Sequence, residues 1–412
     1  MNRNLDLTEV LWLGLMLFSG VLVVLYLWFA LVPGAVDPAV FRFFSAGQVE
    51  RGRAYAFVPR LLYVLNLVIQ GGFLGWLVFS SYGRAFAKAV ERFTGGSYWV
   101  KVFGFSLFLW LTLLILQLPI SIIRGYIWPH AWGLSTQTIS SWWVDYVKSA
   151  LLDLPLTLGL VLGFFFTINR FPRGWWAISA LAVSIWLIIQ NLLWPVVISP
   201  MFNHFEPVQD AAIVDMVHGL AAKAEIPVDQ VLVMDASRRT TTVNAYFTGL
   251  GRTKRIVLYD NLLKYPFDEV KAVVAHEMGH WQKGHVITGL ALGILGNFCL
   301  FALMNLALQP WLSSPRWHGL RTTPVSVWAV VQLFFLLALL VSNPIQNAVS
   351  RGMEREADQV ALSLTGDAAA QVRLQVDLAT KNLADVSPPP YLVWFSYTHP
   401  TALERIKAAE GQ

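Results

Sequence analysis

Long apolar runs separated by short polar loops fill the first half of the chain and recur later. Each run approaches the ~20 residues that a helix needs to cross a bilayer. The fourth is the exception, because its apolar stretch 154–168 reaches that length only if part of 148–153 is drawn in. The pattern predicts a predominantly α-helical, polytopic membrane protein with seven transmembrane helices, at 11–32, 61–81, 102–123, 150–168, 174–198, 286–308 and 325–345.

Two polar stretches, 199–284 and 350–412, flank the last two predicted spans. They must lie on the same side of the membrane, because two crossings separate them. We therefore expect an N-terminal membrane region at 1–198, a polar domain made of both polar stretches, and a two-helix membrane excursion at 285–349 between its two parts.

The polar stretches predict an α+β domain. Apolar periodicity and turn residues indicate helices, β-branched runs indicate strands, and Gly249–Gly251 indicates a turn. A long helix opens at Pro266 and is expected to run with little break into the sixth span, with Gly284 and Gly289 as possible bends. The other predicted elements are helices at 208–224, 350–364, 368–384 and 397–406, strands at 230–235, 240–247 and 255–259, and an extended break at 387–391.

Composition supports the membrane assignment and excludes other classes. The chain is 56% hydrophobic and 13% charged, with a mean hydropathy of +0.54, whereas soluble domains carry about 25% charged residues. The net charge of +5 is not concentrated in a basic stretch, which argues against a nucleic-acid partner. The single cysteine, Cys299, excludes both an intrachain disulfide and a zinc site built from cysteines.

The sequence HEMGH carries the strongest chemical signal. His276 and His280 are four residues apart, so on a helix both imidazoles can reach one zinc ion. Glu277 lies beside them, where it can serve as the base that deprotonates a zinc-activated water.

A third ligand is expected from the polar tail 350–412, whose stretch 350–362 offers three acidic residues. Glu354 and Asp358 share a helix face, whereas Glu356 points elsewhere. We assign Glu354 as the zinc ligand and Asp358 as a proton carrier or as the acceptor for the far N–H of a ligating histidine. Spacing alone also allows the reverse order, or a solvated charged face.

Four further residues have candidate roles with ordinary alternatives. His399 could stabilise the oxyanion or merely cap a helix. Arg405 could hold a carboxylate of the site or lie exposed. Asn244 and Ala245 could present an edge strand to an extended substrate, although a half-buried strand is the simpler reading. The remaining tail and loop histidines are treated as non-ligands, since no ligand spacing relates them: His204, His218, His285 and His318. His285 lies five residues after His280 and is therefore expected off the metal-facing side of the helix.

Beyond HEMGH, several blocks together resemble the type I CAAX prenyl endopeptidases, which are integral-membrane zinc proteases that process prenylated proteins. The matching blocks are 198–208, 244–263, 273–285, 350–362 and 397–406. The resemblance implies seven helices around a chamber, with a gluzincin-like zinc site at its cytosolic end. It implies one Zn²⁺ per chain on His276, His280 and Glu354, with catalytic Glu277, Asp358 and His399 and substrate-binding Asn244, Ala245 and Arg405.

The expected function is a zinc endopeptidase that cleaves near the C-terminus of CAAX-type or other membrane-associated substrates. Its partners would be a peptide or protein substrate, prenylated or not, and the lipid bilayer, and it would work as a monomer. A bacterial inner membrane is preferred over the endoplasmic reticulum, with the site facing the cytoplasm. The alternatives are a heat-shock-type quality-control protease and, from another class, a transporter or receptor with a structural zinc.

Overall fold

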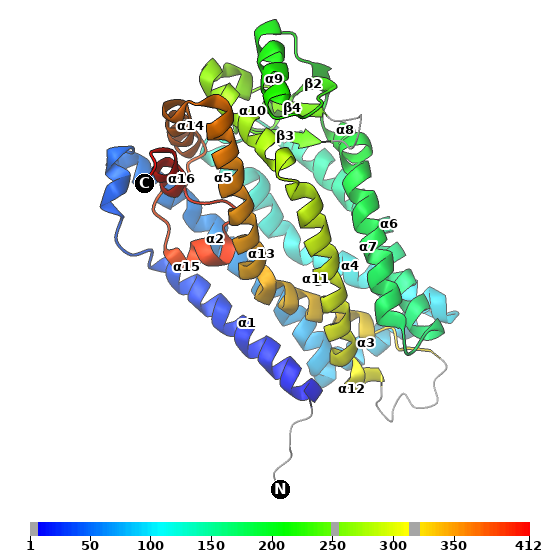
Figure 1. Ribbon diagram of the computed structural model, residues 1–412. Coiled ribbons are helices and arrows are strands. Elements are labelled where there is room, and N and C mark those ends of the chain that lie inside the picture. Colours follow the sequence, from blue (N-terminus) through cyan, green and yellow to red (C-terminus); the bar gives the residue numbers. More distant parts are fainter. Residues whose placement is uncertain (1–6, 249–254, 313–321) are drawn as a thin grey trace.

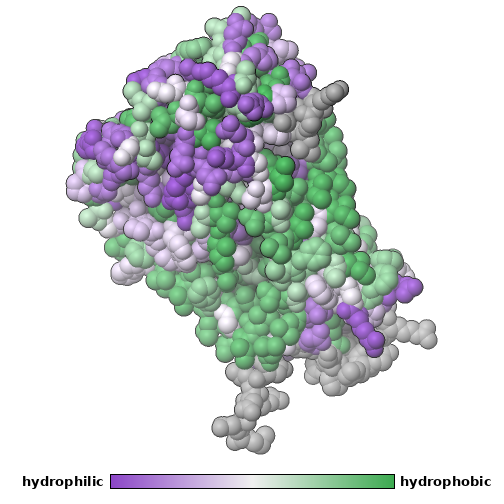
Figure 2. All heavy atoms as spheres, in the orientation of Figure 1, coloured by the Kyte–Doolittle hydropathy of each residue, from purple (hydrophilic) through white to green (hydrophobic). Residues whose placement is uncertain are grey.

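The computed structural model describes residues 7–248, 255–312 and 322–412 of the 412-residue chain. The predicted turn at 249–251 and His318 lie outside the described residues. A bundle of long helices carries a small polar domain at one end, and the chain's C-terminus belongs to that domain (Figure 1). Hydrophilic residues gather toward the ends of the molecule, and hydrophobic residues cover the middle of the bundle (Figure 2).

Among the described residues, seven helices are long and apolar enough to cross a membrane, which confirms the predicted number. The short fourth run belongs to a helix of 32 residues, because polar residues on its N-terminal side extend it. The helices of the membrane region are α1 (Leu7–Leu31), α2 (Ala46–Phe79), α3 (Ser81–Thr94), α4 (Tyr98–Ile122), α5 (Trp128–Ala131), α6 (Ile139–Arg170), α7 (Trp175–Leu193), α8 (Ser199–Phe202), α11 (His285–Ala307), α12 (Gln309–Leu312) and α13 (Val327–Thr365). Short 3₁₀ or π turns lie at Pro38–Arg42, Ile123–Ile127, Trp194–Ile198, Ala236–Arg238 and Leu262–Lys264.

Helix α13 corrects one prediction. The span at 325–345 and the tail helix at 350–364 are one continuous helix of 39 residues, which ends at Gly366 with φ +65°. At 1.5 Å per residue it is roughly 58 Å long, about twice the hydrocarbon thickness of a bilayer. A change from apolar to polar composition does not end a helix, so α13 runs on into the polar domain.

The polar domain contains a four-stranded sheet in its described part. The strand order is β1 (Phe205–Pro207), β2 (Gln230–Met234), β4 (Arg255–Tyr259) and β3 (Ala245–Thr248). The pair β2–β4 is parallel, and the other two pairs are antiparallel. By this order, β1 and β3 are the two edge strands of the described sheet. The strand predicted at 240–247 begins only at Ala245, because the Asn261 amide donates to the carbonyls of Thr240 and Thr242 and holds that segment away from the ladder.

Helices pack on this sheet around an apolar core. Met278 and Ala361 are buried together with the inward residues of β4, Ile256 and Leu258. The helices of the domain are α9 (Ala211–Lys223), α10 (Phe267–Gln282), α14 (Ala368–Lys381), α15 (Pro390–Ser396) and α16 (Ala402–Ala409).

Three predicted boundaries in this domain differ from the structure. Helix α10 stops at Gln282, and left-handed Gly284 (φ +67°), one of the two predicted bends, turns the chain before α11 begins at His285. The extended break at 387–391 gives way to α15, since Pro390 is tolerated in a first helical turn. The last helix, predicted from 397, begins at Ala402; its cap is Thr401, which forms a capping box with Glu404, and not His399.

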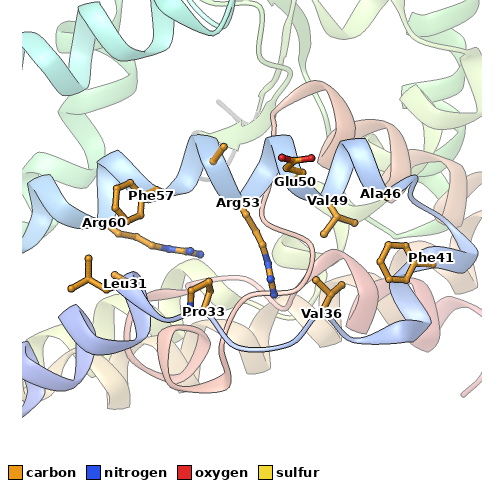
Figure 3. A pocket seen from close by; sticks show the side chains of 12 residues that line it. Leu31, Pro33, Val36, Phe41, Ala46, Val49, Glu50, Arg53, Phe57 and Arg60 are labelled. Atoms are coloured by element: carbon orange, nitrogen blue, oxygen red, sulfur yellow. The ribbon is translucent and has the colours of Figure 1, made fainter.

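Two arginines of α2 fasten the tail to the membrane helices. Arg53 points toward the loop after α1, along a cavity of about 560 Å³ (Figure 3). It donates to the carbonyl oxygens of Gly34 (3.2 Å) and Ser387 (3.0 Å). Arg60 pairs with buried Asp385 at 2.8 Å. The position of the tail is therefore fixed by charge pairing as well as by its apolar contacts.

Helices α10 and α13 approach each other closely at Gly279. A methyl group on Gly279 would lie 2.8 Å from the carbonyl oxygen of Ala357 and 2.9 Å from its Cα. Because both atoms belong to backbone, the space could only be gained by moving one helix away from the other.

Replacing Gly279 by alanine should therefore lower the thermal unfolding temperature of the purified protein, with an overpacking cost of about 1–3 kcal/mol. The matched control is Gly289→Ala in α11, where a methyl group meets nothing within 4 Å. That control should be neutral or mildly stabilising, since alanine favours a helix by about 1 kcal/mol over glycine. Equal unfolding temperatures for the two variants would contradict the close packing.

Candidate metal centre

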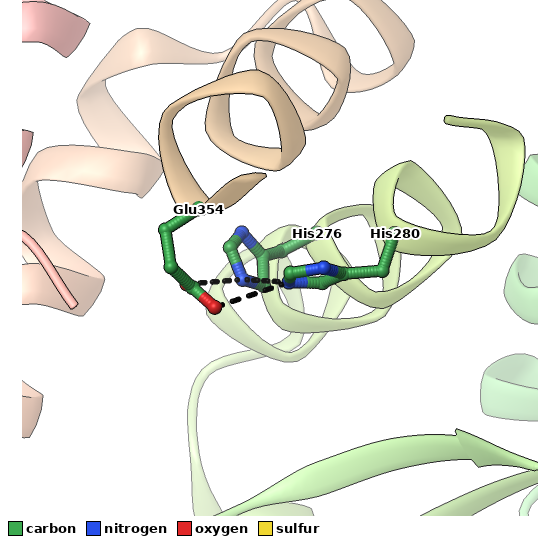
Figure 4. Close-up of side chains that lie close together, drawn as sticks. All are labelled: His276, His280 and Glu354. Carbon is green, nitrogen blue, oxygen red and sulfur yellow. Dashed lines mark hydrogen bonds and ion pairs between the residues drawn. The ribbon is translucent and has the colours of Figure 1, made fainter. Parts of the chain in front are cut away.

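Three ligand atoms converge where α10 meets α13. His276 and His280 come from successive turns of α10, and Glu354 reaches them from α13 (Figure 4). The two Nε2 atoms lie 3.2 Å apart. Glu354 places Oε2 3.2 Å from Nε2 of His276 and Oε1 3.4 Å from Nε2 of His280.

These spacings fit a tetrahedral zinc ion. Zinc–ligand bonds of about 2.0–2.1 Å place tetrahedral ligand atoms roughly 3.3–3.4 Å apart. Glu354 Oε2 is buried, and no donor among the described residues is aligned to hydrogen-bond with it. Two imidazoles and one carboxylate are also a donor set that zinc accepts, with one position left for water.

The charge around His276 also favours a cation. Burial lowers the pKa of its imidazole, but the adjacent carboxylates of Asp358 and Glu354 outweigh burial and raise the pKa to about 9. The two carboxylates therefore favour positive charge beside this ring, and a metal ion would bind its Nε2 only after that nitrogen has lost any proton.

Asp358 lies on the far side of the His276 ring from the other two candidate ligands. Its Oδ1 is 2.9 Å from His276 Nδ1. Arg405 holds the same carboxylate through two hydrogen bonds, at 2.8 Å to Oδ2 and 2.5 Å to Oδ1. Only 13% of the Arg405 side chain is exposed, so it is not a solvated helix arginine. Glu354 therefore faces the space between the histidines, and Asp358 faces the opposite ring nitrogen.

Glu277 lines a pocket of about 180 Å³ together with His276, one of the three candidate ligands. Burial raises the pKa of its carboxyl above the ordinary value, while His276 and His280 act in the opposite direction. The pocket is lined by Val243, Asn244, Val273, His276, Glu277, Leu374, Gln375, Leu378, His399 and Arg405. It thus brings together sequence-predicted residues from three separate parts of the chain.

His399 sits at the mouth of the site. Its Nε2 is 3.4 Å from Oε1 of Glu354, and 58% of its side chain is exposed. Its partial burial lowers the pKa of the imidazole, Glu354 opposes that shift, and Arg405 adds to it. His399 therefore lies within reach of a molecule held at the metal position.

Edge strand β3 begins beside the pocket. The carbonyl oxygen of Asn244 accepts a hydrogen bond from the Tyr259 amide at 3.0 Å, while the Asn244 side chain bonds its neighbour's amide, Ala245 N, at 2.9 Å. Asn244 itself lines the pocket. The outer edge of β3 thus starts next to Glu277.

Sequence reasoning missed two groups of residues here. Leu374, Gln375 and Leu378 of α14 line the pocket, and no motif marks them. His285 was placed off the metal-facing side of the helix by its spacing, but its Nδ1 lies 2.9 Å from Nδ1 of His280. The break at Gly284 was the signal that the helical spacing no longer applied there.

Fold and site define a class, a polytopic membrane metalloprotease. Residues 207–412 match the model of peptidase family M48, and residues 38–204 match that of the CAAX prenyl protease N-terminal region, described as five membrane helices. The chain belongs to peptidase family M48.

Similar proteins come from bacteria and eukaryotes. The uncharacterized metalloprotease YhfN of Bacillus subtilis is 31% identical over 384 residues, which cover 91% of this chain and 88% of YhfN. CAAX prenyl protease 1 of Saccharomyces cerevisiae is 30% identical over 72% of this chain and 69% of its own length. The crystal structure of S. mikatae Ste24p shares the fold, with a TM-score of 0.84 at 23% identity over 99% of this chain and 100% of that one.

Removing a ligand should remove the metal. We expect purified wild-type protein to carry one zinc per chain by elemental analysis, and His280→Ala and Glu354→Ala to lose most of it, because two remaining ligands bind zinc weakly. The control is His204→Ala, because the His204 side chain is 72% exposed and pairs with Glu206. Full zinc content in the first two variants would contradict the ligand assignment.

Proposed function

We propose that this M48 family member is a zinc-dependent membrane endopeptidase that cleaves peptide bonds near the C-terminus of membrane-associated substrates, those of CAAX type among them. One observation carries the proposal: Glu277 and the start of the edge strand line the same small pocket as His276, which lies within ligand distance of His280 and Glu354. A purely structural zinc site needs neither the extra carboxylate nor the adjoining pocket.

The reaction class is hydrolysis. Zinc, when bound, supplies a Lewis acid for the substrate carbonyl and for water. Glu277 accepts a proton from the attacking water while the oxygen of that water bonds to the carbonyl carbon of the substrate. It then delivers that proton to the amide nitrogen as the carbon–nitrogen bond breaks. Burial shifts the pKa of Glu277 upward, in the direction of neutral pH. A group with a pKa near the working pH can serve first as a base and then as an acid.

Asp358 and Arg405 orient His276 in this proposal. The carboxylate accepts the Nδ1 proton of His276, which leaves the Nε2 lone pair directed at the metal position. Arg405 holds the carboxylate by two bonds and offsets its charge. His399, beside Glu354, is placed to donate a hydrogen bond to the oxygen that becomes negative during attack.

The substrate would bind as an added strand along β3. An extended peptide pairs with the free edge of a sheet, and a small residue such as Ala245 permits close approach. The Asn244 amide, at the pocket, is available for the backbone of the scissile residue.

The membrane setting follows from the same proposal. Relatives carry the name CAAX prenyl protease, which supports a lipid-modified, C-terminal substrate for this chain. The polar parts 199–284 and 350–412 would form one protease domain facing the cytoplasm of a bacterial inner membrane, in a protein that works as a monomer with one Zn²⁺.

Replacing Glu277 by glutamine should lower peptide cleavage by at least about 10³-fold while zinc content stays at the wild-type level, because the amide cannot accept the proton of water. Mass spectrometry of peptide products and elemental analysis would measure the two quantities. Glu206→Gln, an exposed glutamate of β1, is the control for the same chemical change. Undiminished cleavage by Glu277→Gln would overturn the assigned base.

A farnesylated CAAX peptide and its unprenylated twin would identify the substrate class. We expect cleavage three residues from the C-terminus, and only with the lipid, because the proposal takes its substrate type from relatives named CAAX prenyl protease. Equal cleavage of both peptides would favour a quality-control protease. Transport of a solute without any cleavage would favour the transporter alternative.

A further inference from the structure

A second chain of hydrogen-bonding groups leads away from the metal centre, on the side of His280. Its Nδ1 lies 2.9 Å from Nδ1 of His285, and Nε2 of His285 lies 3.2 Å from Oε2 of Glu356. The three residues come from three helices: α10, the first position of α11, and α13. The His285 side chain is 7% exposed, whereas that of Glu356 is 56% exposed.

Only one arrangement of protons satisfies this chain when His280 presents Nε2 to a metal. That nitrogen must then be free of a proton, so the neutral ring carries its proton on Nδ1. The Nδ1–H donates to His285, whose own Nδ1 must supply a lone pair. His285 therefore carries its proton on Nε2 and donates it to the carboxylate of Glu356.

We infer that His285 and Glu356 are positioning residues that hold His280 in the ring orientation and tautomer a metal ligand requires. The inference rests on the proposed zinc site and deepens it. Ligating histidines commonly donate their second N–H to a carboxylate. His276 does so directly to Asp358, whereas His280 reaches its carboxylate through one intervening imidazole.

Local backbone geometry explains how His285 comes to face the site. On an unbroken helix a residue five positions after His280 would point away from it. Here α10 has ended, and left-handed Gly284 swings the chain so that the two rings meet edge to face, with centroids 5.0 Å apart. The same turn starts the membrane helix α11, so the orientation of a candidate zinc ligand is coupled to the position of that helix.

Helix α13 serves both sides of the centre. Glu354 and Glu356 are two positions apart and so lie on different faces of the helix. One carboxylate reaches the ligand position, and the other reaches His285. If His285 were buried for packing alone, it would still need hydrogen-bond partners. It would not need one of those partners to be the ring of the candidate ligand His280.

The test compares variants that remove the hydrogen bond with variants that preserve it. His285→Leu cannot accept the Nδ1 proton of His280, whereas His285→Asn places an amide oxygen near the same position. Glu356→Leu cannot accept from His285, whereas Glu356→Gln retains an acceptor. The control is His204→Leu, which breaks a His–Glu pair of similar length (3.1 Å) remote from the candidate ligands in sequence.

Zinc affinity by chelator competition and the visible spectrum of the Co²⁺-substituted full-length protein are the readouts, with thermal unfolding alongside. We expect His285→Leu to bind zinc 10–100-fold more weakly and to alter the Co²⁺ spectrum. Glu356→Leu should have a smaller effect, since its carboxylate is half exposed. His285→Asn, Glu356→Gln and His204→Leu should stay within about threefold of wild type.

Two outcomes would overturn the inference: wild-type zinc affinity and spectrum in both leucine variants, or a loss in His285→Asn as large as in His285→Leu. The second outcome would show that packing, and not the hydrogen bond, matters. Neither would touch the proposed function, provided that the wild type binds zinc and cleaves peptide. A wild-type protein without zinc would instead refute the metal centre itself.

Discussion

The contact between the backbones of α10 and α13 at Gly279 is the constraint on which the site depends. Two histidines on one helix cannot complete a zinc site, so the third ligand must come from elsewhere. It comes from α13, and Ala357, which touches Gly279, lies between Glu354 and Asp358 in sequence. The close approach of the two helices therefore fixes the positions of both carboxylates. That of Glu354 faces Nε2 of His276 at the ligand position, and that of Asp358 faces Nδ1 on the other side of the ring.

Continuity of α13 carries this constraint into the membrane. Helix α13 has 39 residues; it begins among the membrane spans and ends in the polar domain. Because it is one continuous helix, the position of its membrane part also determines where Glu354 and Asp358 lie. The tail returns to it through Arg405, bound to Asp358, and to α2 through the pair of Arg60 and Asp385. The candidate site is thus held in place by contacts with the membrane helices as well as by the apolar core of the polar domain.

The sequence could predict what depends on spacing and length. Seven apolar runs predicted seven spanning helices, and the shared helix face of His276 and His280 predicted ligand atoms that lie within reach of each other. The sequence could not predict the ends of elements that are set by contacts with residues elsewhere in the chain. Thr240–Val243 has strand propensity but is held by Asn261, a residue far along the chain. Helical spacing directed the His285 ring away from His280, but that spacing does not apply across Gly284, where the backbone leaves the helix.

Charge balance gives a physical reason for a divalent ion at this place. Glu277, Glu354 and Asp358 bring three carboxylates into one partly buried site, and Arg405 brings one guanidinium. Two negative charges are left when the histidines are neutral, and buried charge without a counter-charge is costly. The raised pKa of His276 is one response to that excess. A divalent cation between the ligand atoms would offset it fully. Zinc binding should therefore stabilise the fold of the polar domain as well as support its chemistry.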